Sequence, residues 1–336
     1  MQQIPIADEL VRGAVSLRRR DGWVQPWRLP EDQERLFPPD DGVALKAAQA
    51  SGVRLRFRTD TPRLGVCISL VEGGHTFDLT RDNEIVASVR IEEGEDTAWL
   101  DVPAAGPAVY QLWLPQDNFV RLRHLRIEDG AELAPAPDDR PRWITYGSSI
   151  SQCVAAHSPA RTWPAVAARA TDLHLTAMGF GGDCHLEPMV ARTIRDLPAD
   201  LITIKAPVNI YGAASLSPRT LRPALIGFVQ IVRERHPDIP LGIVSAVCYP
   251  YGEVTENAVG FTLPAMRAEL ADAVERVRDA GDANLHFFNG LDVFGPDLAA
   301  RYMPDGLHPN GDGYEILGRN FTKVVLSRLL PGRRSE

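Results

Sequence analysis

Cysteine is scarce in this chain of 336 residues: there are four, and none forms a Cys-x-x-Cys pair. Such wide spacing is not that of a disulfide framework or a zinc ribbon. Cys153, Cys184 and Cys248 each follow an expected strand end and could converge. Because unpaired buried cysteine is common in protein cores, we expect these three to pack in the core and bind no metal.

The chain also lacks a surplus of positive charge and long apolar runs. Asp and Glu outnumber Lys and Arg by 44 to 36, which leaves a net charge of −8. A general binder of nucleic acid or of anionic membranes needs surplus Lys and Arg, so both classes are excluded. No window comes near the roughly 18 apolar residues that span a membrane. The N-terminus lacks the basic and apolar regions of a signal peptide. We therefore expect a cytoplasmic protein with reduced thiols.

What the chain does contain is typical of a globular protein, with 44% apolar and 24% charged residues. Its length favours two domains. Residues 1–130 hold short alternating runs separated by turn residues, which predicts an antiparallel β-sandwich. The expected strands are 53–58, 64–70, 84–91, 97–102, 108–114 and 120–127. Residues 131–142 contain three prolines and five charged residues, a composition that predicts a linker.

From residue 143 onward, apolar runs alternate with helical patterns. The runs are nearly continuous, as expected of strands that are covered on both faces. Helices between such strands predict a three-layer α/β/α domain with a five-stranded parallel sheet, over residues 143–336. The expected strands are 143–147, 173–178, 201–205, 241–247 and 285–288.

Four loops after these strands carry residue types that acyl transfer by a serine requires. Ser149 follows the first strand, and its hydroxyl needs a base to remove the proton. The glycine-rich segment 179–182 lets backbone N–H groups approach an oxyanion, and the amide of Asn209 can add another donor. Asp305 precedes His308 by three residues, so its carboxylate can orient the imidazole as a general base.

In this order, Gly-Ser-Ser-Ile-Ser, Gly-Phe-Gly-Gly, the Asn and Asp-x-x-His-Pro resemble the four blocks of the SGNH (GDSL-like) hydrolase and acyltransferase superfamily. The resemblance covers roughly residues 143–330 and is strongest to bacterial members with an N-terminal β-sandwich. It implies a flavodoxin-like catalytic domain after a jelly-roll-like, carbohydrate-binding-like domain, without a metal or redox cofactor. It also implies a triad of Ser149, Asp305 and His308. The implied oxyanion hole consists of the Ser149 N–H, Gly182 and Asn209.

The sequence departs from the family pattern at three positions. Ser148 stands where the family often has Asp, and Ala177 stands where it often has Asn. Pro207 occupies the glycine position of the family's Gly-x-Asn block. None of these changes removes a proposed catalytic group. Ala177 and Pro207 would nevertheless reshape the walls of the pocket, and with them the class of substrate.

The favoured function is hydrolysis of a small-molecule acyl ester through an acyl-enzyme. His185, Tyr211 and Tyr249 follow strand ends and could line the substrate pocket. The alternative is a structural role for His185 and core or rim packing for the tyrosines. A second hypothesis is an acyltransferase of the same family that moves an acyl group from a thioester or ester to an acceptor hydroxyl, including that of a glycoside. A third is a glycan-binding protein with weak or no catalysis. Its candidate aromatic residues, all in the sandwich, are Trp99, Tyr110 and Trp113.

Overall fold

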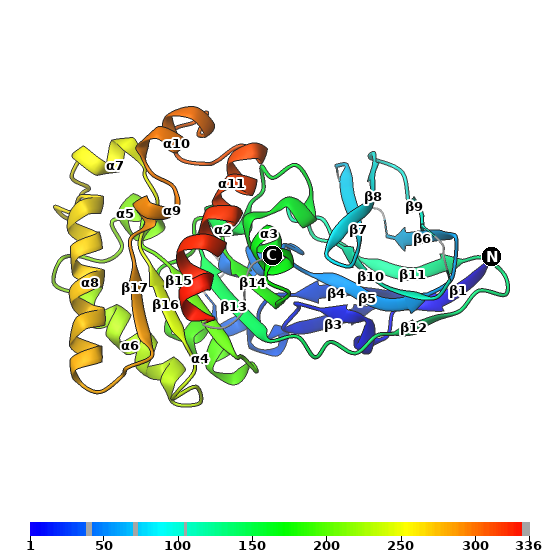
Figure 1. The fold of residues 1–336 in the computed structure, drawn as a ribbon, viewed down its shortest axis with the longest axis horizontal. Helices are drawn as coiled ribbons and strands as arrows, with labels where there is room; N and C mark the ends of the chain where they lie inside the picture. Colours follow the sequence, from blue (N-terminus) through cyan, green and yellow to red (C-terminus); the bar gives the residue numbers. More distant parts are fainter. Residues whose placement is uncertain (38–41, 70–72, 104–105, 331–336) are drawn as a thin grey trace.

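The structure is a computed structural model that describes residues 1–37, 42–69, 73–103 and 106–330. Figure 1 shows a β-rich N-terminal part on the right and a part with alternating strands and helices on the left. This is the fold class that the sequence predicted, and it is confirmed. Within the described ranges, no helix is both long enough and apolar enough to cross a membrane.

The N-terminal part consists of two antiparallel sheets that pack face to face. Alternate side chains of each sheet, such as Phe57 and Val66, are fully buried between them. The first sheet has the order β3-β4-β11-β6-β9 with β1 beside β11. Its strands are β1 (Gln2–Pro5), β3 (Ser16–Arg20), β4 (Trp23–Trp27), β6 (Arg63–Ile68), β9 (Thr97–Asp101) and β11 (Leu122–Ile127).

The second sheet has the order β12-β5-β10-β7-β8 with β2 beside β5. Its strands are β2 (Val11–Arg12), β5 (Arg54–Thr59), β7 (His75–Arg81), β8 (Glu84–Ile91), β10 (Ala108–Trp113) and β12 (Leu133–Pro135). The short helices of this part are η1 (Asp8–Leu10), η2 (Glu31–Leu36) and α1 (Val43–Ala47).

The C-terminal part has one parallel sheet of order β14-β13-β15-β16-β17. Because all five strands run in the same direction, their carboxyl ends meet at one edge of the sheet, where α/β proteins place their ligands. The strands are β13 (Arg142–Gly147), β14 (His174–Gly179), β15 (Leu201–Lys205), β16 (Leu241–Val244) and β17 (Leu285–Phe288). They match the predicted runs to within one residue, except that β16 ends three residues earlier.

Helices cover both faces of this sheet. Trp143 of β13 stacks on Phe321 with 5.7 Å between ring centroids, while Tyr146 faces the other side and stacks on Phe228 at 5.4 Å. The helices are α2 (Ser149–Gln152), η3 (Pro159–Arg161), α3 (Trp163–Ala170), α4 (Pro188–Asp196), α5 (Val208–Ala213), α6 (Leu221–Arg233), α7 (Pro250–Val254), α8 (Leu263–Asp279), α9 (Gly290–Val293), α10 (Pro296–Tyr302), α11 (Gly311–Phe321), the π-helical η4 (Thr322–Leu326) and α12 (Ser327–Leu329).

The two parts share a core and several buried hydrogen bonds. Trp27, Phe37 and Trp113 of the N-terminal part belong to the same apolar cluster as the parallel sheet. The fully buried guanidinium of Arg28 donates to the carbonyl oxygens of Ala177, at 3.2 Å, and Gly179, at 2.7 Å. The sandwich is therefore anchored directly on the end of β14.

The predicted linker, residues 131–142, is not uniformly irregular. Leu133–Pro135 form β12, which pairs with β5 at the edge of the second sheet. A proline is tolerated there because an edge strand leaves one row of backbone groups unpaired. Composition alone could not reveal this strand.

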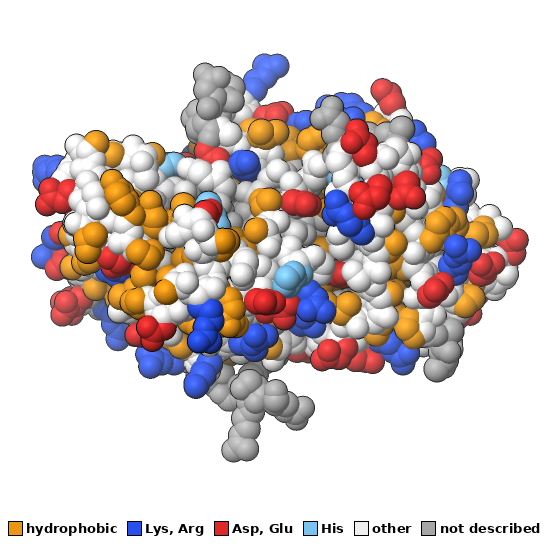
Figure 2. All heavy atoms as spheres, turned by 90° about the horizontal axis from the view of Figure 1, so that it is seen from above, with side chains coloured by type: hydrophobic (Ala, Val, Ile, Leu, Met, Phe, Trp, Pro, Cys, Tyr) orange, Lys and Arg blue, Asp and Glu red, His pale blue; other side chains and the backbone are white. Residues whose placement is uncertain are grey.

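Basic and acidic side chains are interspersed over the face seen in Figure 2, with apolar side chains among them. Such a mixed pattern is typical of a solvated surface. It agrees with the absence of surplus positive charge from the sequence.

Candidate active site

Two adjacent serines follow β13, and they have different surroundings. Ser148 is buried at the N-cap of α2, where its hydroxyl accepts a hydrogen bond from the Ile150 N–H at 3.3 Å. Ser149 is the first residue of α2, and its half-buried side chain points to the loop before α11. The helix can lie this close to β14 because Gly179 has no side chain.

The predicted nucleophile, base and acid form one chain of hydrogen bonds. The Ser149 Oγ lies 2.9 Å from Nε2 of His308, and the His308 Nδ1 lies 2.7 Å from a carboxylate oxygen of Asp305. A carboxylate only accepts hydrogen bonds, so Nδ1 carries the proton and Nε2 is left as an acceptor for the serine hydroxyl. This tautomer is the one that can take a proton from Ser149.

The Asp305 carboxylate is held in its charged form. Partial burial opposes ionisation, but the His308 N–H, the His308 ring and the Leu307 N–H donate to the carboxylate and lower the pKa of Asp305 to about 2. The two N–H bonds also fix the carboxylate within the loop, since both converge on one oxygen at 2.9 and 2.7 Å. Asp305 can therefore orient His308 and stabilise its protonated form.

The residues predicted for an oxyanion hole present unused donors. Within the described residues, the N–H groups of Ser149 and Gly182 have no acceptor, and neither does the side-chain NH₂ of Asn209. The Cys184 N–H donates to the Asn209 side-chain oxygen at 3.2 Å, which fixes the orientation of that amide. Gly182 has φ of +87°, a conformation that favours glycine.

A pocket of about 670 Å³ is lined by two of these donor residues, Gly182 and Asn209, and by three tyrosines. Tyr211 and Tyr249, expected near the substrate, pack edge to face with centroids 6.0 Å apart, and Tyr251 follows. Sequence reasoning missed the other polar members of the wall, Glu256 and Asn257, because they lie in an irregular segment after α7 that carries no family motif. The full lining is Gly182, Val208, Asn209, Tyr211, Gly212, Ala213, Ala214, Tyr249, Tyr251, Glu256, Asn257, Ala258 and Leu307.

The contacts of His185 fit the structural alternative rather than a place in the pocket wall. His185 is absent from the residues that line this pocket. Its Nε2 instead lies 2.9 Å from the carbonyl oxygen of Gly182, and its Nδ1 lies 2.7 Å from the Ser215 hydroxyl. His185 therefore braces the loop that carries Gly182.

Lys205 is buried at the end of β15, and the buried thiols of Cys153 and Cys184 lie near it. Burial lowers the pKa of Lys205 to about 8, and its ammonium group has no hydrogen-bond or ion-pair partner among the described residues. Burial also raises the pKa of the Cys153 and Cys184 thiols, which keeps both protonated. In the described ranges, no group of three His, Cys, Asp or Glu side chains is arranged to hold a metal ion.

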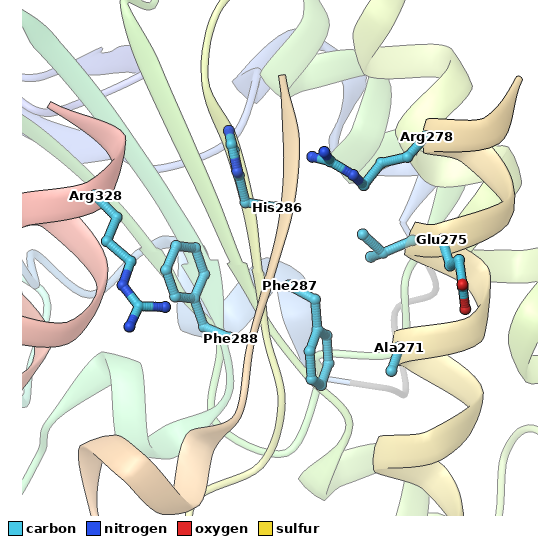
Figure 3. A pocket seen from close by; sticks show the side chains of 8 residues that line it. Ala271, Glu275, Arg278, His286, Phe287, Phe288 and Arg328 are labelled. Carbon is cyan, nitrogen blue, oxygen red and sulfur yellow. The ribbon is translucent and has the colours of Figure 1, made fainter. Parts of the chain in front are cut away.

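A second hollow, of about 480 Å³, lies between α8 and the edge strand β17. Figure 3 shows Phe287 pointing toward α8 and Phe288 toward Arg328 on the other side of the strand. Arg278 is committed to the carbonyl oxygens of Ala283 and Leu285, at 3.2 and 2.7 Å. This hollow is lined by neither a triad residue nor a residue predicted for the oxyanion hole. The tyrosine-lined pocket, by contrast, is lined by Gly182, by Asn209 and by Leu307, the neighbour of His308.

Two family models match the chain. The model of the GDSL-like Lipase/Acylhydrolase family matches residues 144–316, and that of the SsfX3 N-terminal domain matches residues 10–123. No curated protein matches the chain.

Solved structures extend the similarity over the whole chain. The chain is 35% identical to the salicylyl-acyltransferase SsfX3 from a tetracycline biosynthetic pathway, over 99% of each chain, with a TM-score of 0.90. It also resembles a GDSL-like lipase from Bacteroides ovatus, at 21% identity over 98% of each chain and a TM-score of 0.76. A family two carbohydrate esterase from Clostridium thermocellum is 15% identical over 84% of this chain and 94% of that one, with a TM-score of 0.65.

The last two similarities establish the fold alone. The lipase/acylhydrolase model, by contrast, covers just over half of the chain. SsfX3 aligns with both parts of the chain at 35% identity. The chain therefore belongs to the GDSL-like lipase/acylhydrolase family.

Proposed function

We propose that this protein transfers acyl groups through a covalent intermediate on Ser149. The observation that carries the proposal is the unbroken chain from the Ser149 hydroxyl through His308 to Asp305, with spacings of 2.9 and 2.7 Å. His308 takes the hydroxyl proton while the serine oxygen attacks the carbonyl carbon of an ester or thioester. The protonated His308 then gives this proton to the departing alcohol or thiol, which leaves an acyl-enzyme.

The negative charge that develops on the carbonyl oxygen needs preorganised donors. The Ser149 N–H, the Gly182 N–H and the Asn209 NH₂ are the three groups that we propose for this role. None of these three groups donates a hydrogen bond to another described residue. Removing one such donor from a serine enzyme typically costs about 10²–10³ in kcat.

We propose that the acyl group then passes to the hydroxyl of a small-molecule acceptor. His308 removes the proton of that hydroxyl, the new ester forms, and the Ser149 oxygen recovers the proton. The similarity to a salicylyl-acyltransferase along the whole chain supports transfer. Hydrolysis, which sequence analysis placed first, is the second candidate, since the matching family model describes acylhydrolases.

The three tyrosines support an aromatic acyl group as the cargo. Tyr211, Tyr249 and Tyr251 line the pocket next to the proposed oxyanion donors. Flat rings stack favourably on such side chains. The name of the similar acyltransferase, which moves a salicylyl group, points the same way.

Two of the three aromatic residues on which the glycan-binding hypothesis rests are buried. Tyr110 and Trp113 are 1% and 2% exposed, and the Trp113 ring N–H donates to Thr80 at 3.0 Å. Trp99 is half-buried and lies under the guanidinium of Arg63, 4.5 Å from the ring centroid. These rings do not form an open platform for a sugar.

The proposal is tested by intact mass after treatment with a fluorophosphonate. We expect one adduct on the wild type and on Ser148→Ala, and none on Ser149→Ala. In a second experiment, unlabelled wild type is incubated with a benzoyl or an acetyl thioester and is then mixed with a phenolic acceptor. A new ester would establish transfer, whereas release of the free acid alone would establish hydrolysis. A folded wild type that forms no adduct would exclude the proposed nucleophile.

A further inference from the structure

We infer that Gln152 is a positioning residue that the sandwich domain, through Gln49, holds in place to fix the backbone of the Gly181–Gly182 loop. The inference rests on the proposed function, because it concerns the loop that supplies the Gly182 donor. It assigns to the N-terminal part a defined task in catalysis. That task is separate from binding a substrate.

A relay of amide hydrogen bonds connects the two parts. The Gly181 N–H donates to the Gln152 side-chain oxygen at 2.7 Å. The Gln152 NH₂ donates to the side-chain oxygen of Gln49, and the Gln49 NH₂ donates to the carbonyl oxygen of Asp117 at 3.1 Å. Each amide in this relay accepts at one end and donates at the other, so neither can rotate without losing both bonds.

The relay reaches the loop from one side, and His185 reaches it from the other. Gln152 engages the N–H of Gly181, while the His185 ring lies 2.9 Å from the carbonyl oxygen of Gly182. Both ends of this two-glycine segment are thereby held. The Gly182 N–H lies in the chain between these two held groups, and it has no acceptor among the described residues.

Glycine makes such external support necessary. Two neighbouring residues without side chains have a wide range of backbone conformations, and a donor placed by them alone would be poorly oriented. A Cβ atom built on Gly181 would lie 2.8 Å from the Gln152 oxygen and 3.4 Å from the Ser149 Cβ. The loop therefore lies against both the relay and the proposed nucleophile.

The position of Gln152 in the chain couples loop and nucleophile. It is the last residue of α2, the four-residue helix that begins with Ser149, and it is 1% exposed. Ser51 of the N-terminal part donates to its backbone carbonyl at 2.9 Å, so the main chain is held as well. A shift of Gln152 would move the helix of Ser149 and the Gly182 donor relative to each other.

The test uses the full chain with Gln152→Ala, Gln49→Ala and the double variant. Gln116→Ala is the matched control. Its amide also crosses between the two parts, to the carbonyl oxygens of Val154 and Ala156 at 3.4 and 3.3 Å, but it does not reach the loop. Two readouts are taken: hydrogen exchange of the backbone at residues 179–183, and kcat and KM on p-nitrophenyl acetate.

We expect residues 179–183 to exchange faster in Gln152→Ala and Gln49→Ala but not in Gln116→Ala. Misplacing a catalytic group by about 1 Å can cost about 10²-fold, so kcat of Gln152→Ala should fall about 10- to 100-fold. KM should stay within about twofold, because the donor acts on the transition state. The double variant should match Gln152→Ala, since the relay acts through that residue.

Unchanged exchange at residues 179–183 in Gln152→Ala would overturn the inference, whatever the activity. So would an equal loss of kcat in Gln116→Ala, or losses for the single variants that multiply in the double variant. If the wild type neither turns over the ester nor reacts with a fluorophosphonate, the proposed function fails by itself. The exchange comparison then still decides whether the relay holds the loop.

Discussion

At the scale of single residues, Ser148 and Ser149 show how neighbouring hydroxyls acquire separate tasks. The Ser148 oxygen is used by the Ile150 N–H, and the side chain is buried. The Ser149 oxygen is instead within 2.9 Å of His308. A hydroxyl committed to a helix N-cap cannot also reach the base, so the two serines should respond differently to the same substitution.

We predict that Ser148→Ala lowers stability and keeps most of the turnover. Loss of a serine N-cap costs about 1 kcal/mol, which corresponds to a fall in Tm of about 2–4 °C for a domain of this size. Ser149→Ala should keep its Tm and lose about a million-fold in kcat, the typical cost of removing a serine nucleophile. Thermal unfolding and ester turnover measure both effects. Equal losses of turnover in the two variants would show that Ser149 is not the sole nucleophile.

Sequence could place some site residues near one another but not others. Ser149, Gly182 and Asn209 follow three parallel strands, and the carboxyl ends of such strands meet at one sheet edge. Gln49 gave no such signal, because it meets Gln152 across 103 residues and lies in the other part of the chain. Arg28 likewise reaches β14 across about 150 residues. Contacts of this range depend on how the two parts dock, which local patterns do not encode.

At the scale of elements, α2 is the piece whose position matters most for the proposed site. It has four residues, too few to be a stable helix alone. Its place is set by packing against the end of β14, where a Cβ built on Gly179 would lie 2.3 Å from the Gln152 nitrogen and 2.4 Å from the Ser151 carbonyl carbon. These are backbone atoms, so the helix itself would have to move.

We predict that Gly179→Ala displaces α2 and lowers both stability and turnover. Overpacking of this kind costs about 1–3 kcal/mol, and a shift of Ser149 by about 1 Å should reduce kcat about 100-fold. Gly227→Ala is the control: it lies in α6 with no atom within 4 Å of the new Cβ, so it should leave kcat unchanged. Its stability should rise by up to about 1 kcal/mol, since alanine favours helices. Full activity of Gly179→Ala would show that the helix tolerates movement.

Strands that are buried on both faces were predictable from the sequence. Strands at a sheet edge, or with one face that is only partly buried, were less predictable. The strands of the parallel sheet are covered on both faces, so their apolar runs identify them within a few residues. β12 was missed because edge position, not composition, makes it a strand. In β5, the alternating residues Arg54 and Arg58 share one face of the strand, but Arg54 is 1% exposed while Arg58 is exposed. That face meets the parallel sheet at one end and solvent at the other.

At the scale of the whole molecule, a buried charge cluster joins the two parts. Asp138, whose side chain is 2% exposed, pairs with Arg140 at 2.6 Å and with His174 at 3.1 Å. Arg54 lies 4.0 Å away and donates to the carbonyl oxygen of Leu175, in β14, at 2.8 Å. The segment predicted as a linker thus supplies the anion that balances Arg54 and Arg140.

This cluster makes the stability depend on pH. Burial opposes ionisation of Asp138, but hydrogen bonds from Arg140 and His174 dominate and hold the pKa of its carboxyl far below the ordinary range. An unfolded Asp titrates near pH 3.9. Because the pKa is depressed in the folded state, the stabilisation is complete above about pH 4 and is lost as the pH falls below it, by about 1.4 kcal/mol per pH unit.

We predict that Asp138→Asn is destabilised by about 3 kcal/mol at pH 7, since it leaves buried cations without their partner. The difference in free energy of unfolding between Asp138→Asn and the wild type should become smaller as the pH falls below about 4. Burial also lowers the pKa of His174, so its titration adds a loss of stability as the pH falls below about 6.5 that must be fitted separately. The exposed neighbour Asp139 provides the control: Asp139→Asn should stay within about 0.5 kcal/mol at every pH. Urea unfolding of the three proteins from pH 2.5 to 7 measures these differences. A gap that stays constant down to pH 2.5 would mean that Asp138 does not hold the two parts together as an anion.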